Sequence, residues 1–432
     1  MASIPRDSTL KSLRHASNDP YGFISARARA VGSDIFEIKV PFQRVVCMTG
    51  AQACKLFYDP ERFIREGAAP GRIQKTLFGQ GGVQGLDDDA HRHRKQMFLT
   101  LLDAPRIAAL VEETERCWHR QAEIWKSQDS VTLYDGWQGL LTRAVCAWAG
   151  VTLPQDEIEQ RTRELTALFD SAGAVGPKHW WARLARKKAD AWAARIIEDA
   201  RRGGAPAGSI VEGIAQHRQA DGGLLPARIA GVELLNILRP TVAVSVYLTF
   251  VALALYDHPR CRLRIAAGDD ELVGSFVQEV RRFYPFFPAV GARVRETFEW
   301  NGLTFPRGRR VLLDLYGVQH DPRFWQSPEQ FQGERFLDVD PDACSFIPQG
   351  GGDAQTGHRC AGEQLTIELM KAGTRLLCRN LSYEVPEQDL GIDYSRLPAL
   401  PRSGFRIRRV RPSATGMGMP PRKDEAILRR IA

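Results

Sequence analysis

The chain has 432 residues, a quarter of them charged, and a formal net charge of +8 at pH 7. Such a length can bury a large core, and neither a Pro-, Ser- or Gly-rich linker nor an internal repeat divides it. We predict one domain over residues 1–411 and a mobile tail over 412–432. The cations are not interleaved with aromatic residues, which argues against a nucleic-acid partner. The densest basic run, Arg183–Lys188, predicts a solvated basic helix.

Cysteine spacing and hydropathy indicate the compartment. The eight cysteines are dispersed without a Cys-x-x-Cys pair, which indicates neither a zinc site nor a disulfide framework and is typical of a reducing cytosol. The first residues lack the apolar core of a signal peptide. The longest apolar run, Thr241–Tyr256, is shorter than the roughly 20 residues that span a bilayer. The sequence therefore predicts a cytoplasmic protein without a membrane anchor.

The first elements are a hairpin and a glycine-rich loop. Two alternating runs, Ile35–Val40 and Arg44–Met48, predict the hairpin. The glycines in the segment Lys75–Leu86 match neither the dinucleotide nor the nucleoside-triphosphate spacing. We therefore interpret this segment as a loop without a phosphate-binding role.

A helix predicted from Asp87 is followed by helical patterns over most of residues 105–283. Three acids from Asp87 complement the positive end of a helix dipole, and His91 and Lys95 share one face of that helix. The longest helical stretches cover 155–202 and 226–256.

The stretch 226–256 carries an unusual cation. Arg239 has apolar neighbours, and Glu233 is the only acid within six residues. Because a buried guanidinium needs an anion, we expect either a ligand carboxylate, which Arg grips with two hydrogen bonds, or an acid of the protein. Pro240 leaves the carbonyl of Asn236 without its helical partner and predicts a kink.

The last third contains an ordered pair of motifs and strand-like runs over 299–315 and 404–408. In the predicted helix 271–283, Glu279 and Arg282 lie three residues apart and can pair. The irregular segment Pro328–Phe336 supplies Arg335, which would complete a buried Glu-Arg-Arg cluster.

Cys360 is the most informative residue. It ends a glycine-rich loop that starts at Phe346 and precedes an amphipathic helix predicted from Glu363. Backbone N–H groups and the helix dipole favour a thiolate at this place, and a thiolate can ligate a haem iron. For the residue taken alone, the alternative is a buried structural cysteine.

The ordered set of Glu-x-x-Arg, Pro-Glu-x-Phe with Arg335-Phe336, and a glycine-rich loop with Cys-x-Gly resembles the cytochrome P-450 family over nearly the whole chain. The resemblance implies a mainly α fold: a large helical body, a long central helix and a minor β-sheet region. It also implies haem b (iron protoporphyrin IX), with Cys360 as the axial ligand of the iron. Glu279, Arg282 and Arg335 would form the structural triad behind it.

The same resemblance implies that His91, Lys95 and Arg65 contact the haem propionates. Solvated helix charges are the alternative for these residues. A histidine axial ligand is the competing interpretation of the haem site, but neither His91 nor His93 has surroundings as distinctive as those of Cys360.

Two departures from the usual pattern of the family make the chain resemble one branch of it. Asp353 occupies the position seven residues before the cysteine that is usually Phe, and Phe346 lies seven residues further upstream, so the loop is long. Most members place an acid and a Thr in the central helix to relay protons. Arg239-Pro240 stands there instead, and neither residue can deliver a proton. The chain thus resembles the peroxygenase branch, the fatty-acid hydroxylases that use hydrogen peroxide.

This second resemblance implies a reaction. Arg239 would hold the carboxylate of a long-chain fatty acid, which moves a proton between the oxygens of hydrogen peroxide and leads to hydroxylation at the α or β carbon. No redox partner would be obligatory. A haem propionate is an alternative partner for Arg239. Gln84 matches a position that is Gln in hydroxylating members and His in an alkene-forming decarboxylase, which favours hydroxylation.

Four apolar residues would wall the substrate pocket by the same resemblance: Leu77, Phe78, Phe286 and Phe287. Simple core packing is the alternative for the aromatic ones. Three other functions stay open: a fatty-acid decarboxylase that forms terminal alkenes, a reductase-dependent monooxygenase, and a non-catalytic haem sensor.

Overall fold

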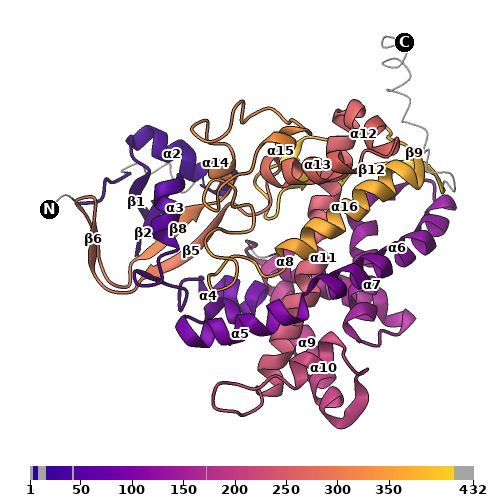
Figure 1. Cartoon of the computed structure of the whole chain (residues 1–432), viewed down its shortest axis with the longest axis horizontal. Helices are drawn as coiled ribbons and strands as arrows, with labels where there is room; N and C mark the ends of the chain where they lie inside the picture. The colour runs from indigo at the N-terminus through magenta and orange to yellow at the C-terminus, as the bar shows by residue number, and fades with distance from the viewer. Residues whose placement is uncertain (1–2, 8–15, 41–42, 172, 413–432) are drawn as a thin grey trace.

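The computed structural model of the chain describes residues 3–7, 16–40, 43–171 and 173–412. Strands gather at one end of the molecule and helices form the larger end (Figure 1). The mainly α fold predicted from the sequence is confirmed.

The strand-rich end is built on a five-stranded sheet of order β1-β2-β8-β5-β3. Its neighbours pair antiparallel except β2 and β8, which are parallel. The predicted hairpin is confirmed, because β1 pairs antiparallel with β2 and places Ile35 opposite Met48. The elements of this end are α2 (Phe23–Val31), β1 (Ile35–Val40), β2 (Gln43–Met48), α3 (Ala51–Phe57), β3 (Phe63–Ile64), β5 (Ala289–Val294), β6 (Phe298–Trp300), β7 (Leu303–Phe305), β8 (Arg310–Asp314) and α14 (Tyr316–Gln319).

The helical body occupies the other end, with the remaining strands at its edge. Its helices are α4 (Gly71–Ile73), the π-helical turn η1 (Gln74–Phe78), the 3-10 turn η2 (Val83–Gly85), α5 (Asp88–Leu101), α6 (Ala104–Lys126), α7 (Leu133–Ala149), η3 (Gln155–Glu157), α8 (Ile158–Asp170), α9 (Pro177–Asp199), η4 (Ala200–Gly204), α10 (Ile210–Ala215), α11 (Ala227–Asp257), α12 (Pro259–Ala266), α13 (Asp270–Phe283), α15 (Arg335–Asp338) and α16 (Glu363–Arg379). Its strands are β4 (Val131–Thr132), β9 (Leu381–Glu384), β10 (Ile392–Asp393), β11 (Leu400–Pro401) and β12 (Arg406–Pro412).

One predicted helical stretch is divided. Residues 155–202 contain η3, α8, α9 and the start of η4. The break falls between α8 and α9, where Gly176 adopts a positive φ of 66° and Pro177 begins α9 at a position where proline is tolerated. At the C-terminal end, Pro412 is the last residue of β12 and faces Leu381, so this first residue of the predicted tail belongs to a strand. Residues 413–432 lie outside the described residues.

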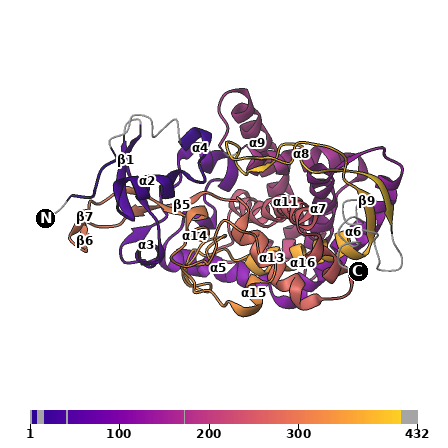
Figure 2. The ribbon, with the colours of Figure 1, turned by 90° about the horizontal axis from the view of Figure 1, so that it is seen from above.

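Helix α11 is the centre of the body. It packs against α7, α8, α9, α13 and α16, and Figure 2 shows it between α7 on one side and α13 and α16 on the other. It runs through Pro240 as one helix. Among the described residues it is the one helix long and apolar enough to cross a membrane, but 94% of its most apolar window is buried inside the protein. That burial is the property of a core helix.

Candidate active site

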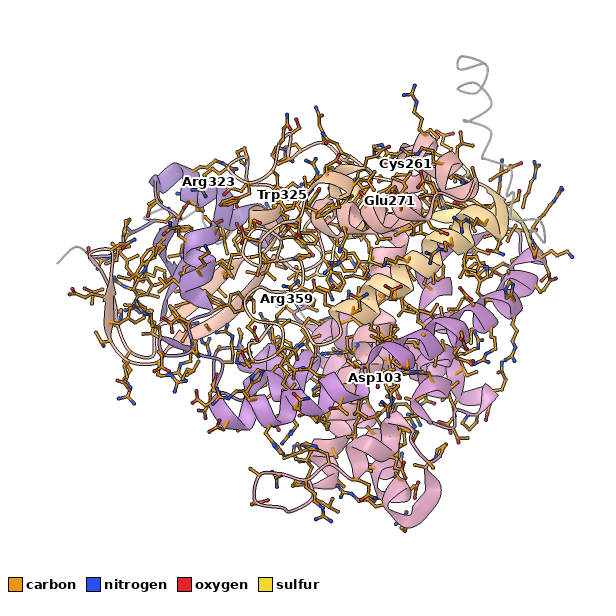
Figure 3. The ribbon with its side chains drawn as sticks, viewed as in Figure 1. Asp103, Cys261, Glu271, Arg323, Trp325 and Arg359 are labelled. Atoms are coloured by element: carbon orange, nitrogen blue, oxygen red, sulfur yellow. The ribbon has the colours of Figure 1, made fainter. Side chains whose placement is uncertain are left out.

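The loop before α16 lies against α5 at the centre of the molecule, where Figure 3 labels Arg359. Lys95 of α5 anchors this loop: its Nζ donates hydrogen bonds to the carbonyls of Gly357 and, at 3.0 Å, Arg359. In the middle of the loop, Gly352 has a φ of 75°, and a Cβ there would lie 2.9 Å from the Tyr58 ring. Only glycine allows this backbone to pass so close to the ring.

The Cys360 thiol ends this loop. Seven cysteines are buried, whereas Cys360 has accessible surface. Burial nevertheless raises the pKa of the Cys360 thiol. The Gly362 N–H and the charges of Arg281 and Lys95 lower it, but by less than burial raises it. The expectation that the loop would favour a thiolate is therefore wrong for the protein alone, because desolvation outweighs the helix N-terminus.

Gln349 and Arg281 surround the thiol from the protein side. Gln349 places its Nε2 at 3.9 Å from Cys360 Sγ, and its Oε1 accepts a 2.9 Å hydrogen bond from Arg281. Arg281 is 1% exposed and also pairs with Glu363 of α16. The sequence analysis missed both residues, because their contacts with the loop depend on how α13 packs.

The expected propionate contacts form a cluster beside the loop. The His91 ring stacks on His358 with centroids 3.8 Å apart, and His358 lies 3.6 Å from Asp87. Burial, together with the charges of His358 and Lys95, lowers the pKa of His91 to about 3, so the imidazole is neutral at pH 7. Arg65 is buried, and its Nε has no hydrogen-bond partner among the residues that the structure describes.

These side chains fit a haem. The accessible sulfur of Cys360 is a suitable axial ligand for iron. The unpartnered guanidinium nitrogen of Arg65 and the ammonium of Lys95 would hold the propionates. Iron binding would also displace the proton that burial keeps on Cys360.

Arg239 projects from α11 and is 6% exposed. Its Nη1 donates a hydrogen bond to the Leu77 carbonyl, and its Nη2 lies 3.4 Å from Asn236 Oδ1. Within the described part of the chain it forms no ion pair with an acid. Burial and the charge of Arg186 lower its pKa to about 9, while Cys360 opposes the shift. The guanidinium is therefore still a cation at pH 7.

The one nearby acid of α11 is engaged elsewhere. Glu233 pairs with Arg94 at 2.6 Å and accepts a 2.8 Å hydrogen bond from Asn236. Asn236 also donates to Gln84 Oε1 at 3.2 Å. Asn236, which sequence reasoning did not single out as a site residue, therefore connects Gln84 with the surroundings of Arg239.

A second guanidinium reaches the same carbonyl. Arg186 of α9 donates to the Leu77 oxygen at 3.2 Å and pairs with Asp190 at 2.7 Å. It is 3% exposed, so the solvated basic helix predicted over Arg183–Lys188 is wrong at this residue: α9 turns its side chain inward. Gly79 is required here, because its φ is 81° and a Cβ would lie 2.0 Å from the Arg186 guanidinium.

The four expected pocket residues are not all equivalent. Leu77 is buried, and Phe78 packs against the main core. Phe286 stacks on Tyr247 of α11 with centroids 4.4 Å apart, whereas Phe287 is 40% exposed. These two phenylalanines line a small cavity with Tyr247 and Pro348.

The predicted Glu-Arg-Arg contacts are present. Glu279 accepts hydrogen bonds from Arg282 at 2.7 and 2.8 Å and from Arg335 at 3.0 Å. The two guanidiniums also donate to backbone carbonyls of residues 319–330. The buried carboxylate therefore connects α13 to the irregular segment before α15.

Comparison with known proteins supports this site. The family model for cytochrome P-450 matches residues 271–404. A structure of cytochrome P450SP alpha (CYP152B1) in complex with (R)-ibuprophen is 50% identical, with a TM-score of 0.90 over 93% of this chain and 98% of that chain. Cytochrome P450EX alpha (CYP152N1) with myristic acid is 41% identical, with a TM-score of 0.91 over 96% and 100%.

A third solved structure, ligand-free cytochrome P-450 OleT, is 31% identical, with a TM-score of 0.91 over 95% of this chain and 99% of that chain. Curated relatives align over shorter stretches. Carnosic acid synthase of Rosmarinus officinalis is 34% identical over 115 residues, which are 25% of this chain and 22% of the relative.

The fold and the site define an enzyme of the cytochrome P-450 class of oxidoreductases, and the chain belongs to that family. Within it, the chain belongs to the CYP152 branch, whose structures it matches over nearly its whole length. A haem cofactor follows from this membership.

Proposed function

We propose that the protein hydroxylates long-chain fatty acids at the α or β carbon with hydrogen peroxide, using haem b held by Cys360. The observation that carries this proposal is Arg239, a buried cation for which the described residues supply no acid. Since an uncompensated buried charge is expensive, the site favours an anionic ligand. A fatty-acid carboxylate satisfies this demand.

The surroundings of Arg239 suit such a ligand. A guanidinium binds a carboxylate with two parallel hydrogen bonds, which positions the group as well as attracting it. The apolar surface of α11 and the side chains of Leu77 and Phe78 would accept the alkyl chain. The CYP152N1 structure contains myristic acid, a carboxylate of this kind.

The bound carboxylate supplies the acid–base group that α11 lacks. Glu233 is held by Arg94 and Asn236, and Arg239 and Pro240 cannot relay a proton. Haem, when bound, activates the peroxide. Arg239 keeps the substrate carboxylate ionised and fixed, so that the carboxylate can move a proton between the peroxide oxygens, and its α and β carbons lie nearest the oxidant.

We further propose that catalysis needs no reductase and that the protein works in the cytoplasm. The first proposal follows from peroxide being the oxidant. The second is supported by the dispersed free cysteines and by the burial of α11.

The test is turnover by purified, haem-loaded protein with hydrogen peroxide and a long-chain fatty acid, without electron-transfer partners. We expect 2- or 3-hydroxy acids. Terminal alkenes as the main product would replace this proposal by the decarboxylase, which Gln84 disfavours. Product formed only when a reductase is added would establish the monooxygenase instead.

Arg239→Ala should lower kcat/KM for the fatty acid by about a hundred- to ten-thousandfold, because both the carboxylate grip and the proton transfer are lost. The absorption spectrum should show that haem is still bound. Arg183→Ala, an exposed cation on α9, is the matched control and should retain activity. Full turnover in Arg239→Ala would remove this residue from the mechanism.

A further inference from the structure

Two buried cysteines far apart in the sequence face each other at the strand-rich end. Cys54 lies in α3 and Cys344 lies 290 residues later, yet their Sγ atoms are 2.6 Å apart. This is closer than the roughly 3.5–4.0 Å of ordinary non-bonded carbon contacts. Both belong to the small core cluster between α3 and the sheet. The other described cysteines have no such partner contact.

Cys344 lies two residues before Phe346, where the glycine-rich loop that ends at Cys360 begins. It is 5% exposed, Cys54 is fully buried, and the residues just before Cys344 are exposed. Cys344 therefore lies directly beneath a surface segment that a small molecule can reach. Sixteen residues further along the same segment lies Cys360, the proposed iron ligand.

Helix α3 already contacts that loop at a second point. Tyr58, at the C-terminal end of α3, accepts a 2.8 Å hydrogen bond from the Gly351 N–H. Its ring packs against Gly352. A covalent bond between Cys54 and Cys344 would thus fasten the loop to α3 beside an existing non-covalent contact.

We propose that peroxide converts Cys54 and Cys344 into a disulfide that fastens the haem-binding loop to α3. The proposal depends on the proposed function only for the origin of the peroxide. Protein disulfides in a reducing compartment are usually transient or redox-sensing. This pair belongs in that class, because reduction would release the loop's covalent anchor and peroxide would restore it.

The chemistry balances with hydrogen peroxide as the only oxidant. The more accessible Cys344 loses its proton, and its sulfur attacks one peroxide oxygen, breaking the O–O bond and giving a sulfenic acid and one water. The Cys54 sulfur then attacks the sulfenic sulfur and displaces a second water. Two thiols are oxidised by two electrons in total, and one peroxide is reduced to two waters.

The experiment maps the thiols of the full-length, haem-loaded protein. The protein is treated with hydrogen peroxide without fatty acid, quenched with catalase and denatured in N-ethylmaleimide; it is then reduced and labelled with heavy N-ethylmaleimide. We expect Cys54 and Cys344 to carry the heavy label and to appear as one cross-linked peptide before reduction. Cys47, a buried thiol of β2, should carry the light label.

Two results would overturn the proposal. One is light labelling of Cys54 equal to that of Cys47. The other is recovery of Cys344 only as sulfinic or sulfonic acid without a cross-link. Because this assay contains no fatty acid and measures no turnover, its outcome is independent of whether the enzyme hydroxylates.

Thermal unfolding provides the second measurement. Oxidation should raise the midpoint on the order of 5–10 °C, and dithiothreitol should reverse the shift, because the cross-link closes a very long loop in the unfolded chain. Cys54→Ala should lose the shift and Cys47→Ala should keep it. If Cys54→Ala does not fold, the peptide mapping of the unaltered protein decides alone.

Discussion

At the residue scale, two buried guanidiniums meet at the carbonyl oxygen of Leu77, and their surroundings separate their roles. Arg186 has Asp190 beside it, whereas Arg239 has only neutral hydrogen-bond acceptors among the described residues. The first cation is neutralised within the protein and can position the Leu77–Gly79 backbone. Arg239 has no such acid in the described part of the chain, so its buried charge favours binding of a substrate carboxylate.

A second residue-scale prediction concerns Gln349, whose Nε2 lies 3.9 Å from Cys360 Sγ. Gln349→Leu removes this weak N–H···S contact, so the thiolate should donate more charge to the iron. We expect the ferric/ferrous reduction potential of the haem-loaded protein to fall by on the order of 30–60 mV. Gln355→Leu, at an exposed position in the same loop, should leave the potential unchanged.

Redox titration followed by the absorption spectrum gives the measurement. An unchanged potential in Gln349→Leu would mean that Gln349 acts only on Arg281 and Thr366, its other partners.

At the element scale, α11 combines a buried apolar surface with a proline in its interior. The proline removes one backbone hydrogen bond in the turn that carries Arg239. Such a local loss persists when function benefits from the geometry that it produces. The packing of α11 against the helices around it, α7, α8, α9, α10, α12, α13 and α16, compensates for it.

Pro240→Ala should therefore stabilise the fold and impair the enzyme. An N–H at position 240 can donate to the Asn236 carbonyl, and we expect the free energy of unfolding to rise by up to about 3 kcal/mol. Fatty-acid turnover should fall because the backbone that aims Arg239 moves. Urea unfolding and the peroxide assay measure the two effects.

The matched control is Pro177→Ala at the first turn of α9, where proline costs little, so stability should change only slightly. If Pro240→Ala is less stable than the unaltered protein, the Asn236 carbonyl does not need a hydrogen bond from position 240.

We expect the free energy of unfolding to depend on pH through Asp314, which lies at the junction of α2, β2 and β8. Burial raises the pKa of Asp314 from 3.8 to about 6, against hydrogen bonds from Ser25, Gly317 and Thr49. Between these two values the folded protein binds the proton more tightly than the unfolded chain does. The free energy of unfolding should therefore fall as pH rises from about 4 to 6, by at most about 3 kcal/mol from this group.

Asp314→Asn should lose that contribution, so the difference in unfolding free energy between the two proteins should change across pH 4–6 and become constant above it. Asp338→Asn, at an exposed position, should show a constant difference. A constant difference for Asp314→Asn would mean that the carboxyl is already ionised at pH 4.

At the scale of the whole molecule, segments from different parts of the chain are joined by buried charges. Glu279 binds Arg282 of its own helix and Arg335. The two arginines donate to the carbonyls of Gln319, at the end of α14, and Gln326, before α15. Lys95 similarly joins α5 to the loop before α16. The Lys95 contact holds the Cys360 loop against the helical body.

Glu279→Gln should destabilise the molecule by about 3–5 kcal/mol, because two buried guanidiniums lose their only carboxylate in the cluster. The midpoint of thermal unfolding should fall, and haem should be lost more readily. Glu271→Gln, at an exposed position on the same helix (Figure 3), should change stability by well under half as much. Equal effects of the two substitutions would contradict a structural role for the cluster.

Local patterns determined much of this protein. The long apolar run over 226–256 and the helical pattern over 271–283 matched α11 and α13 closely. A helix buried on all sides is apolar along its whole length, whereas a half-buried helix repeats its apolar residues every 3.6 positions. The Cys360 loop and the Arg239-Pro240 pair were likewise readable, since their chemistry depends on adjacent residues. The family membership that they indicated is borne out by the comparisons.

Tertiary structure alone decided the rest. Arg186 looked solvated within its helix and proved buried, and Gln349, Asn236 and His358 acquired their neighbours only by packing. The contact between Cys54 and Cys344 spans 290 residues. Short-range sequence patterns do not predict such contacts, because burial and the choice of partner depend on how complete helices, strands and loops are arranged in space.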